Sequence, residues 1–179
     1  MAYTLITGAS AGIGYELAKC FYSNGHSLIL VARNLNTLNA LKAELPETEN
    51  QNVKVIALDL STNDAARVLF EKTQQEGWHV NTLINNAGFG TFGVFDDLDL
   101  ETLQNMMTLN MINVTALMHF YIKPMREKKQ GQVINIASTA TSGTYSAAKS
   151  TVFIVSGETS TAASADSTIN IAATAAAAN

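Results

Sequence analysis

Short apolar segments alternate along this chain with longer amphipathic segments, and this alternation restricts the possible fold more than any other feature of the sequence. A short continuous apolar run is typical of a strand buried on both faces, whereas a longer segment with apolar residues at helical spacing is typical of a surface helix. Strands buried on both faces occur in parallel sheets that helices cover. We therefore predict an α/β fold with a doubly wound parallel sheet and helices on both faces.

The predicted elements follow one another at regular spacing. Strands are expected at residues 2–7, 27–32, 52–58, 80–85, 132–137 and 167–172. Helices are expected at residues 13–24, 35–45, 63–76, 100–129 and 145–162. Ser61 is predicted to cap the third helix, and Pro124 is predicted to distort the fourth.

Length and composition limit the function classes. A chain of 179 residues with a net charge of −4 and scattered basic residues is not expected to bind nucleic acid. Cys20 is the single cysteine, which excludes an internal disulfide and fits a reducing compartment. Neither a secretory signal nor an apolar run of transmembrane length is present, so we expect a cytoplasmic protein without a membrane partner.

A glycine-rich turn joins the first predicted strand to the first predicted helix. The segment TLITGASAGIGYEL (residues 4–17) places Gly8, Gly12 and Gly14 between them. Glycines let the turn fold tightly and let a diphosphate approach the backbone. The following helix offers free N–H groups and the positive end of its dipole to that anion. The position of the turn therefore predicts a phosphate-binding site.

This turn, T-G-x-x-x-G-I-G, resembles that of the short-chain dehydrogenase/reductase family. The segments LDL (58–60) and NNAG (85–88) and the pair Tyr145-x-x-x-Lys149 agree with that resemblance. It implies a Rossmann-type fold and a nicotinamide dinucleotide cofactor, with Asp59 near the adenine. The residues expected to bind the cofactor are Gly8, Ser10, Gly12, Ile13, Gly14, Arg33, Asp59, Leu60, Asn86, Ala87, Gly88, Tyr145 and Lys149.

The segment after the second predicted strand bears on which nicotinamide is bound. LVARN (30–34) lacks the acid that usually accepts hydrogen bonds from the ribose 2′-hydroxyl of NAD. Arg33 stands where a 2′-phosphate would lie, and a guanidinium matches phosphate in charge and in paired donors. Ser10 can add a hydroxyl. We therefore expect NADP(H) as the cofactor.

The resemblance also implies a catalytic group. Tyr145 and Lys149 are four residues apart, so one helix face would present both. A nearby ammonium favours the phenolate and lowers a tyrosine pKa from about 10. By resemblance, Tyr145 is the acid/base, Lys149 lowers its pKa and holds the ribose, Ser138 stabilises the substrate oxygen, and Asn110 supports a water relay. The expected substrate is a small-molecule carbonyl or secondary alcohol.

Two features depart from the family pattern. Tyr145 follows Ser138 by seven positions, where the family has about a dozen, and Ala, Ser and Thr dominate residues 159–179. The tail is a low-complexity segment, a redesigned sequence, or a run of unidentified side chains. The continuing helix–strand rhythm favours the last. We expect a single domain over residues 1–179, with chain missing between Ser138 and Tyr145 and after about residue 172.

The remaining features leave alternatives open. His26, His79 and His119 have no ligand cluster near them in sequence, so no metal site is predicted. Met107, Met111 and Met118 suggest core or subunit packing, and by resemblance a homodimer or homotetramer is expected. Residues 89–99 line a substrate pocket or merely pack their loop. The main hypothesis is an NADP(H)-dependent oxidoreductase, and its rival is a nucleotide-binding sensor or assembly subunit without turnover.

Overall fold

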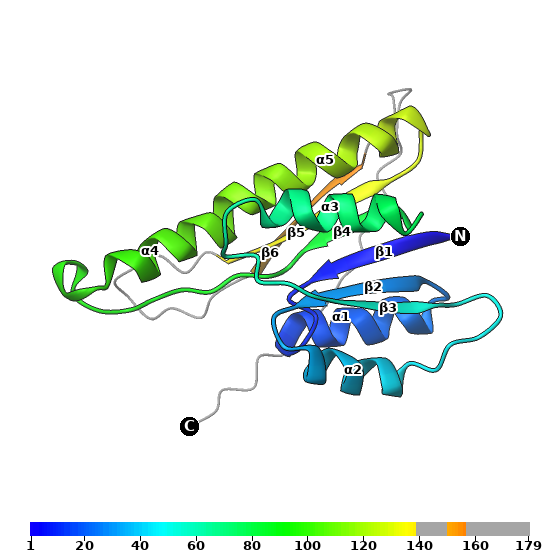
Figure 1. Ribbon diagram of the computed structural model, residues 1–179, viewed down its shortest axis with the longest axis horizontal. Coiled ribbons are helices and arrows are strands. Elements are labelled where there is room, and N and C mark those ends of the chain that lie inside the picture. The colour runs from blue at the N-terminus through cyan, green and yellow to red at the C-terminus, as the bar shows by residue number, and fades with distance from the viewer. Residues whose placement is uncertain (139–149, 157–179) are drawn as a thin grey trace.

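The computed structural model describes residues 1–138 and 150–156, which contain one six-stranded sheet (Figure 1). The strands are β1 (Ala2–Thr7), β2 (Ser27–Ala32), β3 (Val53–Ala57), β4 (His79–Asn85), β5 (Gln132–Ser138) and β6 (Ser150–Ser156). Their order in the sheet is β3-β2-β1-β4-β5-β6, with β1 to β5 parallel and β6 antiparallel to β5. The predicted doubly wound parallel sheet is confirmed for the first five strands.

Helices cover both faces of the sheet (Figure 1). They are α1 (Gly12–Ser23), α2 (Leu35–Glu44), α3 (Ala65–Gln75), α4 (Leu100–Met107) and α5 (Val114–Glu127), with a 3₁₀ helix η1 (Phe95–Asp97) and a π-helix η2 (Thr108–Asn113). Helices α1 and α2 pack on one face, and α3 and α5 pack on the other. The element boundaries up to β5 lie within two residues of those predicted, apart from the division of the fourth helix.

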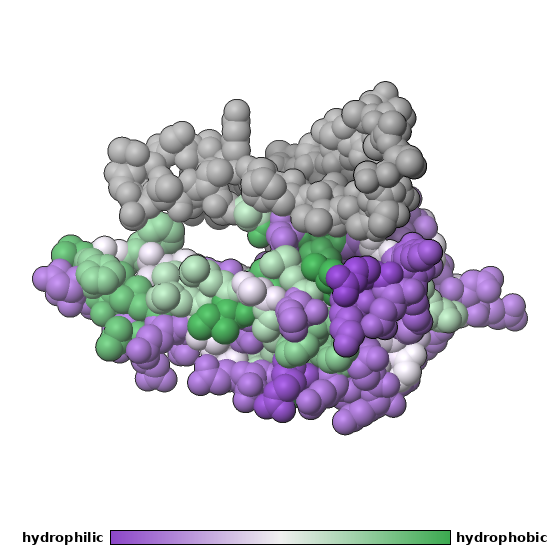
Figure 2. All heavy atoms as spheres, turned by 90° about the horizontal axis from the view of Figure 1, so that it is seen from above, coloured by the Kyte–Doolittle hydropathy of each residue, from purple (hydrophilic) through white to green (hydrophobic). Residues whose placement is uncertain are grey.

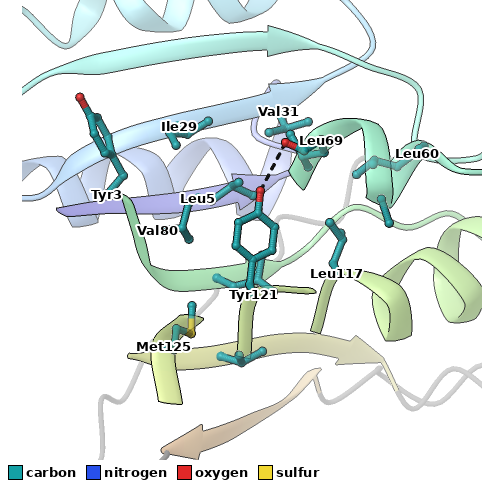
Figure 3. Close-up of a cluster of buried hydrophobic side chains, with 14 residues drawn as sticks. Tyr3, Leu5, Ile29, Val31, Leu60, Leu69, Val80, Leu117, Tyr121 and Met125 are labelled. Carbon is teal, nitrogen blue, oxygen red and sulfur yellow. Dashed lines mark hydrogen bonds between the residues drawn. The ribbon is translucent and has the colours of Figure 1, made fainter. Parts of the chain in front are cut away.

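Alternate residues of the central strands build two separate cores. In β2, Leu28 and Leu30 belong to the cluster under α1 and α2, whereas Ile29 and Val31 belong to the cluster under α3 and α5. All four side chains are fully buried. Figure 3 shows the second cluster, in which Tyr121 lies among aliphatic side chains and points its hydroxyl toward the Leu69 carbonyl. Each buried aliphatic side chain contributes about 1.5–3 kcal/mol to stability.

The fourth helical stretch is interrupted at a different place from the one predicted. Pro124 lies inside α5, which continues past it to Glu127. The interruption is instead the π-helix η2, which separates α4 from α5. A π-helical turn is wider than an α-helical turn and is frequent at functional sites. Here it contains two asparagines, Asn110 and Asn113, whose amides bond to other parts of the chain.

The predicted cap of the third helix is wrong. Ser61 does not cap α3, because its hydroxyl donates to the Asp59 carboxylate. The residue at the N-cap position is Asp64, whose backbone is left-handed (φ 60°) and whose side chain caps nothing. The amide oxygen of Asn113 accepts from the Ala66 N–H instead. This cap comes from another helix, which a reading of local sequence cannot detect.

The helix predicted over residues 145–162 is wrong for residues 150–156, which form β6 beside β5. Residues 151–155 are four β-branched residues and one phenylalanine, and such a run favours a strand over a helix. The tyrosine–lysine spacing indicates a helix at the start of this segment. Tyr145, Lys149 and the strand predicted at 167–172 lie outside the described residues.

Candidate functional site

A pocket of about 430 Å³ lies at the carboxyl ends of four neighbouring strands. Gly8, Arg33, Leu58 and Asn86 each follow directly the last residue of β1, β2, β3 and β4, and each lines this pocket. Ligands of doubly wound sheets bind at this edge. The full lining is Gly8, Ser10, Ala11, Ile13, Val31, Ala32, Arg33, Asn34, Leu58, Asp59, Leu60, Ser61, Asn86, Ala87, Gly88, Phe89 and Leu109.

Most residues predicted to bind the cofactor meet in this pocket. Of the eleven such residues that the structure describes, Gly12 and Gly14 do not line it. Gly14 serves the turn in another way: a Cβ there would lie 2.2 Å from the Gly8 oxygen and 2.4 Å from the Asn86 amide nitrogen. The first turn of α1 therefore packs directly on the backbone of the glycine turn. Gly8 has φ +66°, and a Cβ there would lie 2.8 Å from the Ala87 Cα.

The N-terminus of α1 is left open toward the pocket. Its N-cap residue, Ala11, has no side chain that can accept from the first-turn N–H groups, and no acid lies in that turn. By contrast, Asn34 caps α2 by accepting from two backbone N–H groups, and Asp99 caps α4. Unpaired N–H groups at a helix N-terminus bind anions such as phosphate.

Thr7 and Asn86 connect the glycine turn to the segment after β4. The Thr7 hydroxyl accepts from the N–H groups of Asn86 (2.9 Å) and Ala87 (3.0 Å) and donates to the Ile84 carbonyl (3.3 Å). In return, the Asn86 amide donates to the carbonyls of Thr7 (3.0 Å) and Gly8 (3.2 Å). Two walls of the pocket are thus fixed to each other.

A positive and a negative side chain face the pocket from β2 and β3. Arg33 is exposed, and Asp59 is half-buried. Burial raises the pKa of Asp59, but hydrogen bonds from the Ser61 hydroxyl (2.7 Å) and N–H (2.9 Å), together with the charge of Arg33, bring that pKa below its ordinary value of 3.8. Asp59 is therefore a carboxylate at neutral pH.

Asn110 fastens the loop after NNAG to the π-helix. Its amide nitrogen donates to the Phe89 carbonyl (2.8 Å), and its amide oxygen accepts from the Phe89 N–H (3.2 Å). A Cβ on Gly88 would lie 3.1 Å from that oxygen. The side chain thus holds the backbone that borders the pocket. Its predicted part in a water relay stays a prediction.

Two of the four predicted catalytic residues, Ser138 and Asn110, lie within the described part of the chain. Ser138 is the last residue of β5, and its backbone is in register with Ser150 of β6. Tyr145 and Lys149 lie outside the described residues. The cofactor side of the site is therefore described in detail, while the acid/base pair stays a prediction from the sequence.

Two residues that shape the pocket were missed in the sequence. Thr7 precedes the first glycine, and Asn113 follows Asn110 by three residues in TLNMIN. Both are buried. The available signal was a polar residue inside an otherwise apolar strand or helix face, because buried polar groups in proteins are hydrogen-bonded.

The loop between Phe89 and Asp99 carries exposed apolar side chains. Phe92 and Phe95 are 81% and 78% exposed, while Phe89 lines the pocket. Leu100 of α4 and Met107 are also largely exposed. Figure 2 shows hydrophobic residues gathered at the end of the molecule where α4 lies. This loop therefore does not pack its phenylalanines down onto the core.

Neither a metal centre nor a membrane span is found in the described part of the chain. Within residues 1–138 and 150–156, no three His, Cys, Asp or Glu side chains are grouped so that they could hold a metal ion. Over the same ranges, no helix has the length and apolar character needed to cross a membrane.

The family model described as short chain dehydrogenase matches residues 2–177. The chain belongs to this family. Among curated members of the short-chain dehydrogenases, mouse dehydrogenase/reductase SDR family member 7B is 31% identical over 140 residues, which are 76% of this chain and 43% of that protein. Bovine 3-ketodihydrosphingosine reductase is 31% identical over 144 residues, which are 78% of this chain and 43% of that protein.

Solved structures of short-chain dehydrogenases share the fold. A short-chain dehydrogenase from Sphingobium yanoikuyae in complex with NADPH gives a TM-score of 0.71 at 32% identity, covering 78% of this chain and 54% of that one. The bulky-bulky ketone specific alcohol dehydrogenase from Comamonas testosteroni gives a TM-score of 0.70 at 31% identity, covering 78% and 55%. This chain thus spans less than half the length of the two curated relatives and about half that of these structures.

Proposed function

We propose that this short-chain dehydrogenase binds NADP(H) and transfers hydride between it and a carbonyl or secondary alcohol. The observation that supports this most is the pocket at the carboxyl ends of β1 to β4. It combines a helix N-terminus without a side-chain cap, a close-packed glycine turn, and the Arg33 and Asp59 side chains. The open helix N-terminus fits a diphosphate, and the glycine turn lets that diphosphate approach the backbone. Arg33 fits the 2′-phosphate of the adenosine, and Asp59 fits its adenine end.

Arg33 is the proposed determinant of NADP(H) over NAD(H). It is exposed at the pocket rim and has no ion pair within 4.0 Å among the described residues. Its donors are therefore available to a 2′-phosphate. Two of the solved relatives are complexes with NADPH and NADP, which agrees with this assignment.

A pair of arginine variants tests the assignment. A charge-assisted hydrogen bond contributes about 1.5–3 kcal/mol, so Arg33→Ala should weaken NADPH binding by roughly 10- to 100-fold. NADH, which lacks the phosphate, should bind to this variant as it does to the wild type. Arg126→Ala removes the same charge from the last turn of α5, which does not line the pocket, and should leave both affinities unchanged. Equal losses in the two variants would refute the role of Arg33.

In the proposed reaction, the bound nicotinamide supplies or accepts the hydride. Tyr145 would protonate the substrate oxygen in the reducing direction and accept that proton in the reverse direction. Lys149 would lower the pKa of Tyr145 and hold the ribose, and Ser138 would donate to the substrate oxygen. Asn110 would support a water path to Lys149. A 3-oxoacyl thioester, a steroid-like ketone and a small hydroxy acid are all compatible substrates.

Turnover is tested by the oxidation of NADPH in the presence of a panel of ketones and aldehydes. Tyr145→Phe should abolish turnover while NADPH binding stays nearly intact. Tyr22→Phe, whose hydroxyl bonds to the Pro46 carbonyl away from the pocket, is the matched control and should turn over normally. Wild-type turnover in Tyr145→Phe would remove Tyr145 from its role.

A second function, binding of the nucleotide without turnover, is favoured by one observation. The helix expected to run from Tyr145 to residue 162 is replaced over residues 150–156 by β6. Together with the short Ser138–Tyr145 spacing, this favours a sensor or an assembly subunit. NADPH binding without oxidation of NADPH by any substrate in the panel would support this second function.

We also propose that the protein assembles as a homodimer or homotetramer. Exposed apolar side chains on the 89–99 loop, α4 and η2 would be covered in such an assembly; they are Phe92, Val94, Phe95, Leu100, Met107, Met111 and Ile112. Exposed apolar patches of this kind mark interaction sites. Light scattering after size exclusion gives the mass directly, and a monomer at micromolar concentration would contradict this proposal.

A further inference from the structure

We propose that Asn113 is a positioning residue for the adenosine side of the pocket, acting through the segment between β3 and α3. This segment, residues 58–64, contributes Leu58, Asp59, Leu60 and Ser61 to the pocket. Asn113 itself does not line the pocket and would touch no bound nucleotide. The inference rests on the proposed function, because it concerns how the nucleotide pocket is held in shape.

The hydrogen bonds of Asn113 are directed at this segment and at the helix that follows it. The amide nitrogen donates to the carbonyls of Leu60 and Thr62, both at 2.8 Å. The amide oxygen accepts from the Ala66 N–H at 3.2 Å. Asn113 is 3% exposed, so both amide donors and the acceptor are used inside the protein and not on water.

The 58–64 segment needs this support because its own hydrogen bonds are short-range. Asp59 accepts from the N–H and hydroxyl of Ser61, and its carbonyl accepts from the Thr62 hydroxyl. These bonds shape residues 59–62 as a unit but do not fix the unit to the rest of the molecule. The Leu58 N–H bonds to the Ala32 carbonyl at the start of the segment. Asn113 supplies polar anchors at Leu60 and Thr62.

Both anchoring asparagines belong to the π-helix. Asn110 and Asn113 are three residues apart in η2. Asn110 holds the backbone of Phe89, and Asn113 holds the backbone of Leu60. Two pocket walls that follow different strands are thus attached to one helical turn. The hydrogen bonds of Asn113 to the segment that contains Asp59 have no other explanation in the site.

A pure capping role for Asn113 can be separated from a positioning role by Asn113→Asp. The variant has nearly the same shape, and its carboxylate can still accept from the Ala66 N–H at the favourable N-terminus of α3. It has lost the two donors, however, and places an acceptor opposite the Leu60 and Thr62 carbonyls. Capping would therefore be retained while the anchoring of the 58–64 segment would be lost.

The experiment measures the affinity for adenosine 2′,5′-bisphosphate by calorimetry in the wild type, Asn113→Asp and Tyr121→Phe. Tyr121→Phe is the matched control, because it removes a buried side-chain hydrogen bond to the same helix α3, made from α5 and away from the pocket. Hydrogen exchange of the Ser61 amide reports the segment directly. Asn113→Asp should weaken the nucleotide at least about tenfold and speed that exchange, with neither change in Tyr121→Phe.

Each outcome decides a different point. Equal affinities in the wild type and Asn113→Asp would overturn the inference alone. Equal losses in Asn113→Asp and Tyr121→Phe would show general destabilisation and would also overturn the inference. A wild type that does not bind the nucleotide would overturn the proposed function, and the inference with it. If Asn113→Asp fails to fold, Asn113→Ser, which is too short to reach both carbonyls, gives the same comparison.

Discussion

Thr7 and Asn86, which are 79 residues apart in the chain, hold each other through reciprocal hydrogen bonds. The Thr7 hydroxyl accepts from the Asn86 N–H at 2.9 Å, and the Asn86 amide donates to the Thr7 carbonyl at 3.0 Å. Neighbouring strands β1 and β4 thus continue their pairing beyond the end of the sheet, by means of side chains. The pocket floor owes its shape to this pair.

Replacing Thr7 by valine tests the pair. Valine has the same shape but would leave the half-buried N–H groups of Asn86 and Ala87 without the acceptor that they share. An unsatisfied buried group costs about 1–3 kcal/mol and a half-buried one less, so Thr7→Val should lower the free energy of unfolding by roughly 1–3 kcal/mol. Urea denaturation measures the change. Thr7→Ser keeps the hydroxyl and should lose less than half as much; a reversed order would contradict the hydrogen-bond argument.

Gly14→Ala tests the close contact of α1 with the glycine turn. The new Cβ would lie 2.2 Å from the Gly8 oxygen, so helix or turn must shift, and NADPH affinity should fall at least tenfold by fluorescence titration. Gly77→Ala is the control, because its φ of +67° strains alanine by about 1–2 kcal/mol in open space far from the pocket. That variant should lose stability without losing affinity. Unchanged affinity in Gly14→Ala would refute the contact argument.

The buried pair Thr73 and Tyr121 should respond asymmetrically to mutation. We predict that the Thr73 hydroxyl donates its proton to the Phe70 carbonyl, 2.8 Å away, and that Tyr121 is the donor in the 2.9 Å contact between the two hydroxyls. Tyr121→Phe removes that donor and should cost about 1 kcal/mol. Thr73→Val leaves the Tyr121 hydroxyl with the Leu69 carbonyl at 3.5 Å and should cost about 1–3 kcal/mol. Equal costs in urea denaturation would contradict this donor assignment.

Asp59 should make stability depend on pH in the acid range. Its pKa in the folded protein lies below the ordinary 3.8, because the Ser61 bonds and the Arg33 charge outweigh burial. A lowered pKa stabilises the folded state above pH 3.8, and this contribution is lost as the pH falls through the folded value. Asp59→Asn cannot titrate, so the stability difference between wild type and variant should stay constant from pH 7 to 5. Below pH 4 this stability difference should shrink. A difference that grows below pH 4 would contradict the lowered pKa of Asp59.

Sequence reasoning predicted the fold well up to β5, because strands buried on both faces leave a continuous apolar signal. Segments such as SLILVA, which forms β2, could be located to the residue. The β6 strand was not predicted, because the four-residue spacing of Tyr145 and Lys149 indicates a helix just before the β-branched run that forms the strand. The π-helix was missed because apolar periodicity does not distinguish α from π turns over six residues.

The candidate site was predictable where a motif follows a strand, as at Gly8, Arg33 and Asn86. A residue that directly follows a parallel strand lies at the edge of the sheet where ligands bind, so its sequence position alone is enough to predict its place. The supports of the site were not predictable in the same way. Thr7 and Asn113 act through bonds to segments 79 and 53 residues away, and such partners follow from the fold and not from local sequence.

The central claim is that the pocket at the carboxyl ends of β1 to β4 binds NADP(H) in preference to NAD(H). Equilibrium titration of the wild-type chain with NADPH and with NADH, followed by nicotinamide fluorescence, tests it most directly. We predict saturable binding of both, with NADPH at least about tenfold tighter, because Arg33 can pair with the 2′-phosphate. Tighter binding of NADH would contradict the assignment of Arg33, and an absence of binding by either nucleotide would contradict the claim as a whole.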